Sequence, residues 1–371
     1  MRDSISRIDC QEVAVYLLGE KNMATRKLRC YSYLLGLAMA GTLPACSDNK
    51  PAGPLSGRVT IDGSATVLPL SQAMAQAFHD VNPAVQFANE FSGTGGGFRK
   101  FCAGQVDMVG ASRPIKSAES EQCKAQRIEY IEVPVAFDRL AVVVNPKNTF
   151  VDCLTVNELK SMWEPAAEGK TNQWKQIRTS FPAQPMVLFG PGNDSGTFDY
   201  FTLAIVGTET SSRSDYTKSE DDRVIEHGVA GEPNALGYFG YAYYEANKEE
   251  LKVVAVDSGH GCVTPSAQTV ADGTYQPLSR PLFLYVNSAA AARPEVKAFT
   301  RFYLAPENTK YVTQVGYVPL PLAALSAQAA RFEKGVTGSF LGGHGSVTGV
   351  KLDAFDEEEK EKDRVRSALV R

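Results

Sequence analysis

Short apolar stretches alternate with amphipathic segments along the chain from Arg58 onward. After the first stretch, for example, Leu70, Met74, Ala77 and Phe78 recur at the spacing of one helix face. The pattern predicts strands over residues 58–62, 86–92, 106–111, 186–189, 253–256 and 281–286. It predicts helices over residues 95–103, 117–126, 155–163 and 294–304, with a further helix after Ser195. Strands that alternate with helices indicate an α/β fold with a largely parallel sheet.

A longer apolar stretch over residues 128–145 interrupts this alternation. We expect it to carry the chain from a first lobe into a second, and the helix over 294–304 to lead back. The pattern therefore predicts two discontinuous lobes joined by a two-strand hinge, with a ligand cleft between them. The expected division is lobe I from residues 58–138 and 278–350, lobe II from 139–277, and a charged tail over 351–371.

The first 45 residues have a different character. Arg26, Lys27 and Arg29 precede an apolar run over 31–43 that is too short to span a membrane comfortably, which is typical of a signal peptide. Met23 could then be the natural start. The run ends in the tetrapeptide Leu-Pro-Ala-Cys, which resembles a bacterial lipobox with Cys46 as the lipidated residue. Residues 46–57 would form a tether, and the protein would lie in the periplasm or on the cell surface, anchored by lipid.

The cysteines support an oxidising compartment. Three of the seven are Cys10, Cys30 and Cys46, which leaves four in the body of the protein, and these can pair in three ways. We favour Cys102 with Cys123, because that bond closes a local helix-strand-helix loop, and Cys153 with Cys262. No CxxC spacing occurs and the chain has four histidines, so a zinc site is not expected.

The charge balance argues against nucleic acid as a partner. The formal net charge is -4, and it falls to about -6 without residues 1–45, which carry six basic and four acidic side chains. An anionic ligand would have to be held by local dipoles and hydrogen bonds, since the overall field opposes it.

Three clusters of small residues lie where a strand leads into a helix. They are Asp62-Gly63-Ser64-Ala65-Thr66-Val67, Ser92-Gly93-Thr94-Gly95-Gly96-Gly97 and Asp194-Ser195-Gly196-Thr197. A helix N-terminus has unpaired N–H groups and a partial positive charge, and Ser or Thr hydroxyls add donors. Three such junctions together predict a site for a tetrahedral oxyanion. Ser112 and Arg113 follow another strand, and the planar guanidinium of Arg113 suits oxyanion oxygens.

Other kinds of site fit the sequence less well. The glycine-rich cluster has Phe98 where a dinucleotide motif needs its third glycine. A phosphate-ester hydrolase with Ser195 or Thr94 as nucleophile is the enzymatic alternative, but the GxSxG motif is absent and no histidine is placed as a base. The aromatic run over 238–244 is expected to form lobe core and rim. No cofactor is expected.

The chain resembles the PstS-like phosphate-binding proteins of bacterial ABC importers, in particular their SphX-like branch, over residues 57–349. The resemblance is carried by the segments IDGSATVLPLS, EFSGTGGGFRKFCAGQVDMVGASRPI, PVAFDRLAVVVNPKN, GPGNDSGTFDYF, GYFGYAYY and GYVPLP. It implies a type II periplasmic-binding-protein fold that closes on inorganic phosphate, performs no chemistry on it, and docks as a monomer on a membrane permease. The implied phosphate contacts are Thr66, the Val67 amide, Thr94, Ser195, Gly196 and Thr197, with Ser64 and Ser112 as neighbours.

The sequence departs from the well-studied relatives at two positions. They have an aspartate where Arg113 stands and an arginine where Pro191 stands. In those relatives the aspartate accepts the proton of hydrogen phosphate, which excludes sulfate. Asp138, Asp194 and Asp199 are the candidates for that role here, and sulfate or another oxyanion remains an alternative ligand.

Overall fold

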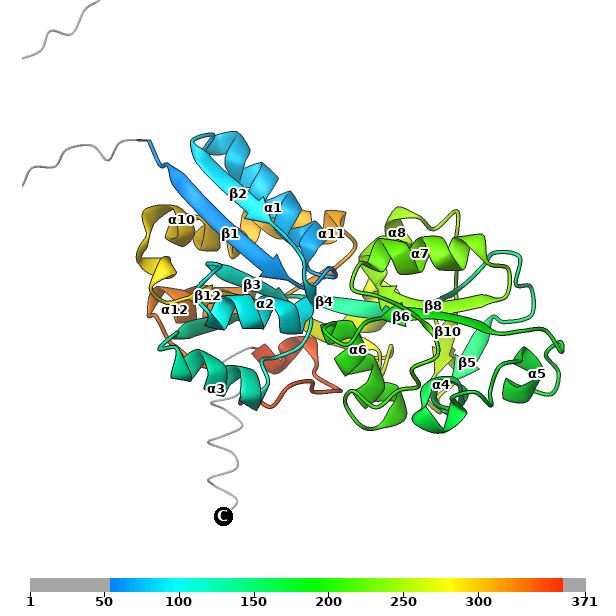
Figure 1. Cartoon of the computed structure of the whole chain (residues 1–371). Coiled ribbons are helices and arrows are strands. Elements are labelled where there is room, and N and C mark those ends of the chain that lie inside the picture. The colour runs from blue at the N-terminus through cyan, green and yellow to red at the C-terminus, as the bar shows by residue number, and fades with distance from the viewer. Residues whose placement is uncertain (1–53, 356–371) are drawn as a thin grey trace, which may run out of the picture. The chain divides into compact units, whose positions relative to one another are not determined.

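The structure is a computed structural model that describes residues 54–355 (Figure 1). The predictions for the signal peptide, for Cys46 and most of the tether, and for the charged tail beyond Phe355 lie outside the described residues.

The first elements follow the predicted alternation. They are β1 (Gly57–Gly63), α1 (Leu68–Val81), β2 (Val85–Asn89), α2 (Gly93–Cys102), β3 (Met108–Ala111) and α3 (Ser117–Ala125). In α1 the buried face contains Leu70, Met74 and Phe78, as the spacing predicts. Helix α2 begins two residues before the predicted Gly95, so its first turn contains the glycine-rich cluster.

The long apolar stretch forms one strand, β4 (Tyr130–Val144), which is buried at every position. Its first part pairs antiparallel with β12 (Ser279–Asn287), from Tyr130 opposite Asn287 to Arg139 opposite Ser279. Its last residues, from Leu140, pair antiparallel with β8 (Ala235–Gly240). Figure 1 shows β4 running from the elements around β12 toward those around β8.

The second series of elements begins after β4. It comprises β5 (Cys153–Thr155), α4 (Val156–Trp163), η1 (Pro165–Ala167), α5 (Trp174–Ile177), β6 (Val187–Pro191), α6 (Gly196–Phe201), η2 (Thr202–Val206), β7 (Thr217–Ser219), α7 (Asp222–Gly231), β8, α8 (Tyr241–Ala246), β9 (Lys252–Val253), β10 (Ala255–Asp257), β11 (Cys262–Val263) and α9 (Ala267–Ala271). The chain then returns through β12, η3 (Ala290–Ala292), α10 (Pro294–Tyr303), η4 (Pro306–Asn308), α11 (Thr309–Gln314), β13 (Val318–Pro319), α12 (Leu322–Glu333) and η5 (Leu352–Phe355).

The large sheet has the strand order β2-β1-β3-β12-β4-β8-β6-β7, with β9 and β13 also paired to β4. The outer pairs β1–β2, β1–β3, β6–β7 and β6–β8 are parallel. The pairs that involve β4 and β12 are antiparallel, so the prediction of a largely parallel sheet was wrong at the centre. A strand buried on both faces shows the same continuous apolar run whether its neighbours are parallel or antiparallel. The sequence therefore could not distinguish the two kinds of strand pairing.

The buried apolar side chains form separate cores. One core draws mainly on residues 59–137 and 282–355, while two others draw on 140–278. The change of core occurs between Phe137 and Leu140, and again between Leu278 and Leu282. We call the elements of the first core lobe I and those of the other two cores lobe II. Lobe I thus comprises residues 59–137 and 282–355, and lobe II comprises residues 140–278. The aromatic run over 238–244 contributes Tyr238 and Phe239 to the lobe II cores, both with no exposed surface.

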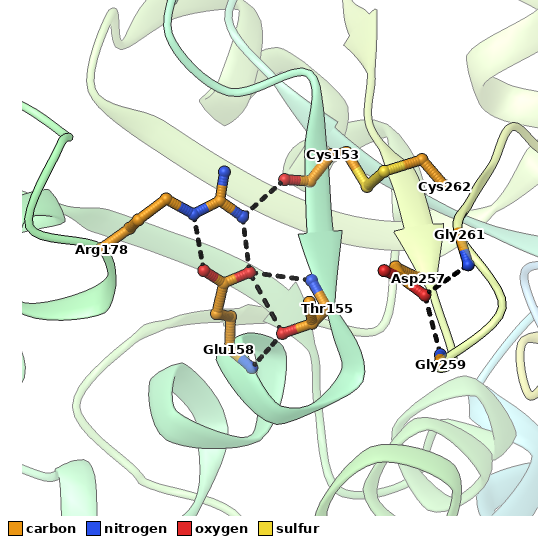
Figure 2. The surroundings of a disulfide bond; sticks show 8 residues. All are labelled: Cys153, Thr155, Glu158, Arg178, Asp257, Gly259, Gly261 and Cys262. Carbon is orange, nitrogen blue, oxygen red and sulfur yellow. Dashed lines mark hydrogen bonds and ion pairs between the residues drawn. A yellow bond between two sulfur atoms is a disulfide. The ribbon is translucent and has the colours of Figure 1, made fainter.

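Both predicted disulfides are confirmed. Cys102 on α2 is bonded to Cys123 on α3, and Cys153 on β5 is bonded to Cys262 on β11. Strand β10 lies between β5 and β11 in a separate three-stranded sheet, so the second bond ties the two outer strands together (Figure 2). Figure 2 also shows Glu158 receiving two hydrogen bonds from Arg178, which fixes the start of α4 beside Cys153.

Between residues 54 and 355, none of the helices combines the length and the apolar character that crossing a membrane requires.

We predict that the second disulfide contributes measurably to stability. It closes a loop with a sequence separation of 109 residues, and loss of such a bond costs about 2–5 kcal/mol, because the unfolded chain gains freedom. The double variant Cys153→Ala/Cys262→Ala should therefore lose about 2–4 kcal/mol of unfolding free energy in urea titrations. The companion variant Cys102→Ala/Cys123→Ala opens a separation of 21 residues and should lose less. An unchanged urea midpoint in the first variant would contradict this account.

Candidate functional site

Hydroxyl groups from the three predicted clusters meet at the junction of the lobes. Thr66 of lobe I and Thr197 of lobe II have their Oγ1 atoms 3.0 Å apart. The Ser112 Oγ atom lies 2.9 Å from Ser64 Oγ and 3.3 Å from Thr94 Oγ1. All five side chains are buried. The clusters that the sequence analysis singled out therefore converge in space, although nothing in the periodicity placed them next to one another.

Gly196, the first residue of α6, brings the lobe II backbone against this group. A Cβ atom at Gly196 would lie 2.6 Å from both Ser112 Oγ and Thr94 Oγ1, closer than real contacts allow. The position therefore requires glycine, because backbone and hydroxyls approach too closely for a side chain. Ser195 precedes it as the helix N-cap and accepts a hydrogen bond from the Thr197 N–H at 3.1 Å.

Two further residues of the first cluster, Val67 and Asp62, make hydrogen bonds that hold the clusters themselves together. The Val67 amide donates to the Ser64 carbonyl at 3.1 Å in the turn that begins α1. Asp62 accepts from Ser92 Oγ at 2.7 Å and forms an ion pair with Lys100, so it ties the first cluster to the second.

The sequence analysis missed Arg280, which lies beside the Thr66 and Thr197 hydroxyls. Its NH2 group is 2.9 Å from Thr197 Oγ1 and 3.4 Å from Thr66 Oγ1, and its NH1 group donates to the Gly196 carbonyl at 3.3 Å. Arg280 is 1% exposed and pairs with Asp138, directly opposite in the β4–β12 register, at 2.9 Å. A guanidinium is thus held inside the junction by one carboxylate, with hydroxyl groups of both lobes around it.

Arg113 does not have the predicted arrangement. Its Nε donates to Asp199 at 2.6 Å, and its two terminal nitrogens donate to Glu119 at 2.8 and 2.7 Å. Burial alone would lower the pKa of Arg113, but the carboxylates of Glu119 and Asp199 outweigh it and raise that pKa. The guanidinium fork of Arg113 is therefore already paired with two carboxylates.

The three predicted proton acceptors are each paired with a cation. Asp194 receives two hydrogen bonds of 2.7 Å from Arg99 and is partly exposed. Asp199 is paired with Arg113 and Lys116, and Asp138 with Arg280. The hydrogen bonds from Arg99 lower the pKa of Asp194, whereas burial raises the pKa of Asp138 and of Asp199 against the opposing effect of their cationic partners.

Asp222 differs from these three. It is the first residue of α7, is 2% exposed, and lies 3.5 Å from Thr66 Oγ1, and among the described residues no ion pair reaches it. Burial raises the pKa of the Asp222 carboxyl to about 7, against the opposing effects of the Arg280 charge and a hydrogen bond from the Gly240 N–H. Asp222 is therefore a carboxyl at this junction, without a paired cation among the described residues, whose protonation can respond near neutral pH.

Comparisons with known proteins show the family to which the chain belongs. A protein-family model described as a PBP superfamily domain matches residues 48–307. Protein SphX of Synechocystis sp. is 48% identical over 302 residues, which are 81% of this chain and 88% of that protein. Phosphate-binding protein PstS of Staphylococcus saprophyticus is 35% identical over 78% of this chain and 90% of its own length.

Solved structures share the fold. A protein from Planctomyces limnophilus matches with a TM-score of 0.57 and 43% identity over 76% of this chain and 99% of its own. A Clostridium perfringens protein solved with bound phosphate matches with a TM-score of 0.62 and 26% identity, over 71% and 100%. The predicted periplasmic-binding-protein fold is confirmed. This chain belongs to the PBP superfamily and, within it, to the family that includes protein SphX and the phosphate-binding protein PstS.

Proposed function

We propose that this protein captures inorganic phosphate between its lobes and delivers it to the permease of an ABC importer. The observation that carries the proposal is the pairing of Thr66 and Thr197, one from each lobe, around the guanidinium of Arg280, with the Ser64, Thr94 and Ser112 hydroxyls next to Gly196. A tetrahedral oxyanion needs many donors and one compensating charge, and this group supplies both. The family relationship adds phosphate as the particular anion, since a relative solved with phosphate has the same fold.

Capture requires the lobes to separate. The Thr66 and Thr197 hydroxyls lie 3.0 Å apart and both side chains are buried, so an anion can reach them from solvent only when the lobes move apart. Because β4 and the chain just before β12 connect the lobes, bending at these two crossings would open the junction. Closing would then surround the ligand with hydroxyls and exclude water, which strengthens each hydrogen bond.

Asp222 is our assignment for the proton acceptor. An ionised carboxylate this close to the site repels a fully ionised anion such as sulfate, but it accepts the proton of hydrogen phosphate. The groups that face it are Arg280 on β12, Asp138 on β4, the adjacent Asp221, Tyr243 on α8 and Tyr317 before β13. Arg280 is the one cation among them, and it is already paired with Asp138.

An enzymatic role is not supported. The relatives are binding proteins of phosphate transport, and the Ser195 hydroxyl is occupied as a helix cap. Within the described residues, the side-chain hydrogen bonds of Ser195 and Thr94 involve no histidine, so neither hydroxyl has a histidine base. The protein is therefore a binding protein and not a hydrolase.

We place the protein in the periplasm or outside the cell, where its two disulfides would persist.

A lipid anchor at Cys46 and a monomeric state complete the proposal. Metabolic labelling with a palmitate analogue should mark the full-length chain and leave a Cys46→Ser variant unmarked. Light scattering of the protein without residues 1–45 should give the mass of one chain. Equal labelling of both forms would refute the anchor.

We predict that Arg280→Gln weakens phosphate binding at least 100-fold, about 3 kcal/mol, because the one central cation is lost. The change also leaves Asp138 buried without a partner, so the double variant Asp138→Asn/Arg280→Gln should regain stability without regaining affinity. Calorimetric titration measures the affinity, and thermal unfolding reports the stability. The control Arg178→Gln removes an arginine paired with Glu158 in lobe II and should bind normally. Normal affinity in Arg280→Gln would mean that the site is misplaced.

We predict that Asp222→Asn admits sulfate. At pH 8 the variant should bind sulfate at least 10-fold more tightly than the wild type, because the repelling charge is gone. In the wild type, sulfate affinity should rise as pH falls through about 7, where Asp222 takes up its proton, whereas the variant should show little change between pH 6 and 8.

The matched control for this change is Asp221→Asn, one residue earlier. Asp221 caps α7 by accepting from the Arg223 N–H, a role that asparagine also fills, so selectivity should stay as in the wild type. Phosphate binding that is retained in Asp222→Asn without any gain in sulfate affinity would exclude Asp222 as the acceptor.

A further inference from the structure

The chain after α12 forms a segment, residues 336–355, that is fastened to lobe I, and we call it the strap. The Gly338 N–H donates to the Tyr130 carbonyl at 2.9 Å, and the Gly345 N–H donates to the Ile115 carbonyl at 3.0 Å. At its far end Phe355 has no exposed surface and packs against the rings of Phe137 and Phe283. The strap is therefore held at several places along its length by elements of the same lobe.

Between these attachments the strap reaches lobe II at Glu209. The Glu209 carboxylate accepts the Ser346 Oγ–H at 2.6 Å and the Ser346 N–H at 3.1 Å. Glu209 follows η2, where the Thr210 N–H donates to Thr202 Oγ1 at 2.8 Å and Thr210 has a φ of 66°. A non-glycine residue rarely adopts a positive φ, so the local backbone is held in a specific conformation that positions Glu209.

A second set of contacts continues from this point toward α6. Lys116 of lobe I lies 3.5 Å from Glu209 and 2.8 Å from Asp199, and Arg113 lies 2.6 Å from Asp199. Asp199 and Glu209 belong to lobe II, whereas Arg113, Lys116 and Ser346 belong to lobe I. Each of these pairs exists only while the lobes are together, and none of these residues is a hydroxyl donor of the site described above.

We propose that the strap, Lys116 and Glu209 form a clasp that stabilises the closed arrangement of the lobes and slows the escape of the bound anion. Contacts made in one of two states shift the equilibrium toward that state by their differential free energy. The Glu209 side chain is 24% exposed, so water competes with the clasp and its effect is a moderate one. The effect on phosphate release rests on the proposed function, whereas the effect on lobe closure does not.

The structure offers a matched control. Glu168 binds Ser214 in the same way, accepting the Ser214 N–H at 3.0 Å and the Ser214 Oγ–H at 2.7 Å, and both residues lie in lobe II. Glu209→Ala and Glu168→Ala therefore both remove a carboxylate that accepts two hydrogen bonds from a serine, but only the first change removes contacts between the lobes, including the ion pair with Lys116.

The test is the rate of phosphate release, measured by stopped flow. Glu209→Ala should release phosphate about 3–10-fold faster than the wild type, with the association rate changed much less, because the clasp acts on the closed state. Glu168→Ala should release phosphate at the wild-type rate. Release from Glu209→Ala at the wild-type rate, or an equal increase in both variants, would overturn the clasp.

Small-angle X-ray scattering of the phosphate-free proteins gives an independent measurement. Glu209→Ala should have a larger radius of gyration than the wild type, since more molecules are open, and Glu168→Ala should not. If the wild type fails to bind phosphate, the proposed function is wrong, and the scattering measurement alone then tests the clasp. Identical radii of gyration in all three proteins would refute the clasp.

Discussion

The buried pair of Arg280 and Asp138 is the interaction on which the junction of the lobes depends. Removing two charges from water is costly unless each neutralises the other and their remaining hydrogen-bonding positions are filled. The pair sits where β4 passes from one lobe to the other, with Arg280 1% exposed and Asp138 fully buried. The hydroxyls of Thr66 and Thr197 and the Gly196 carbonyl receive the spare donors of the guanidinium. A bound anion would accept hydrogen bonds from these same donors.

This arrangement explains how a chain with a net charge of -4 can bind an anion. The field of the whole protein is unfavourable, but neutral hydroxyls and backbone groups in a water-excluded junction act at short range, where the overall charge matters little. A guanidinium held by one carboxylate contributes charge without leaving a strong cation unpaired in the interior. Binding then requires little reorganisation of Thr197, Gly196 and Arg280, because α6 and β12 already position them.

Much of the fold followed from periodicity, whereas the site followed only in part. The three small-residue clusters could be found because strand-to-helix junctions have a recognisable composition, and they do meet. Arg280 was missed because the predicted strand began at Pro281, and an arginine directly before an apolar run looks like a residue outside the strand. Asp222 was missed because an aspartate at the start of a helix is ordinary capping chemistry. The pairing of Arg113 with two carboxylates was not foreseen, because the sequence does not show that Glu119 and Asp199 fold onto it.

The course of the chain between the lobes has a practical consequence. Lobe II is formed by one continuous segment inserted between β4 and β12, so β1 at the start of the described chain and η5 at its end both belong to lobe I. A surface, tag or fluorescent partner fused at either terminus is therefore attached to the same lobe. Under the proposed opening of the junction, lobe II would move relative to that attachment, and a single reporter on lobe II would convert ligand capture into a measurable signal.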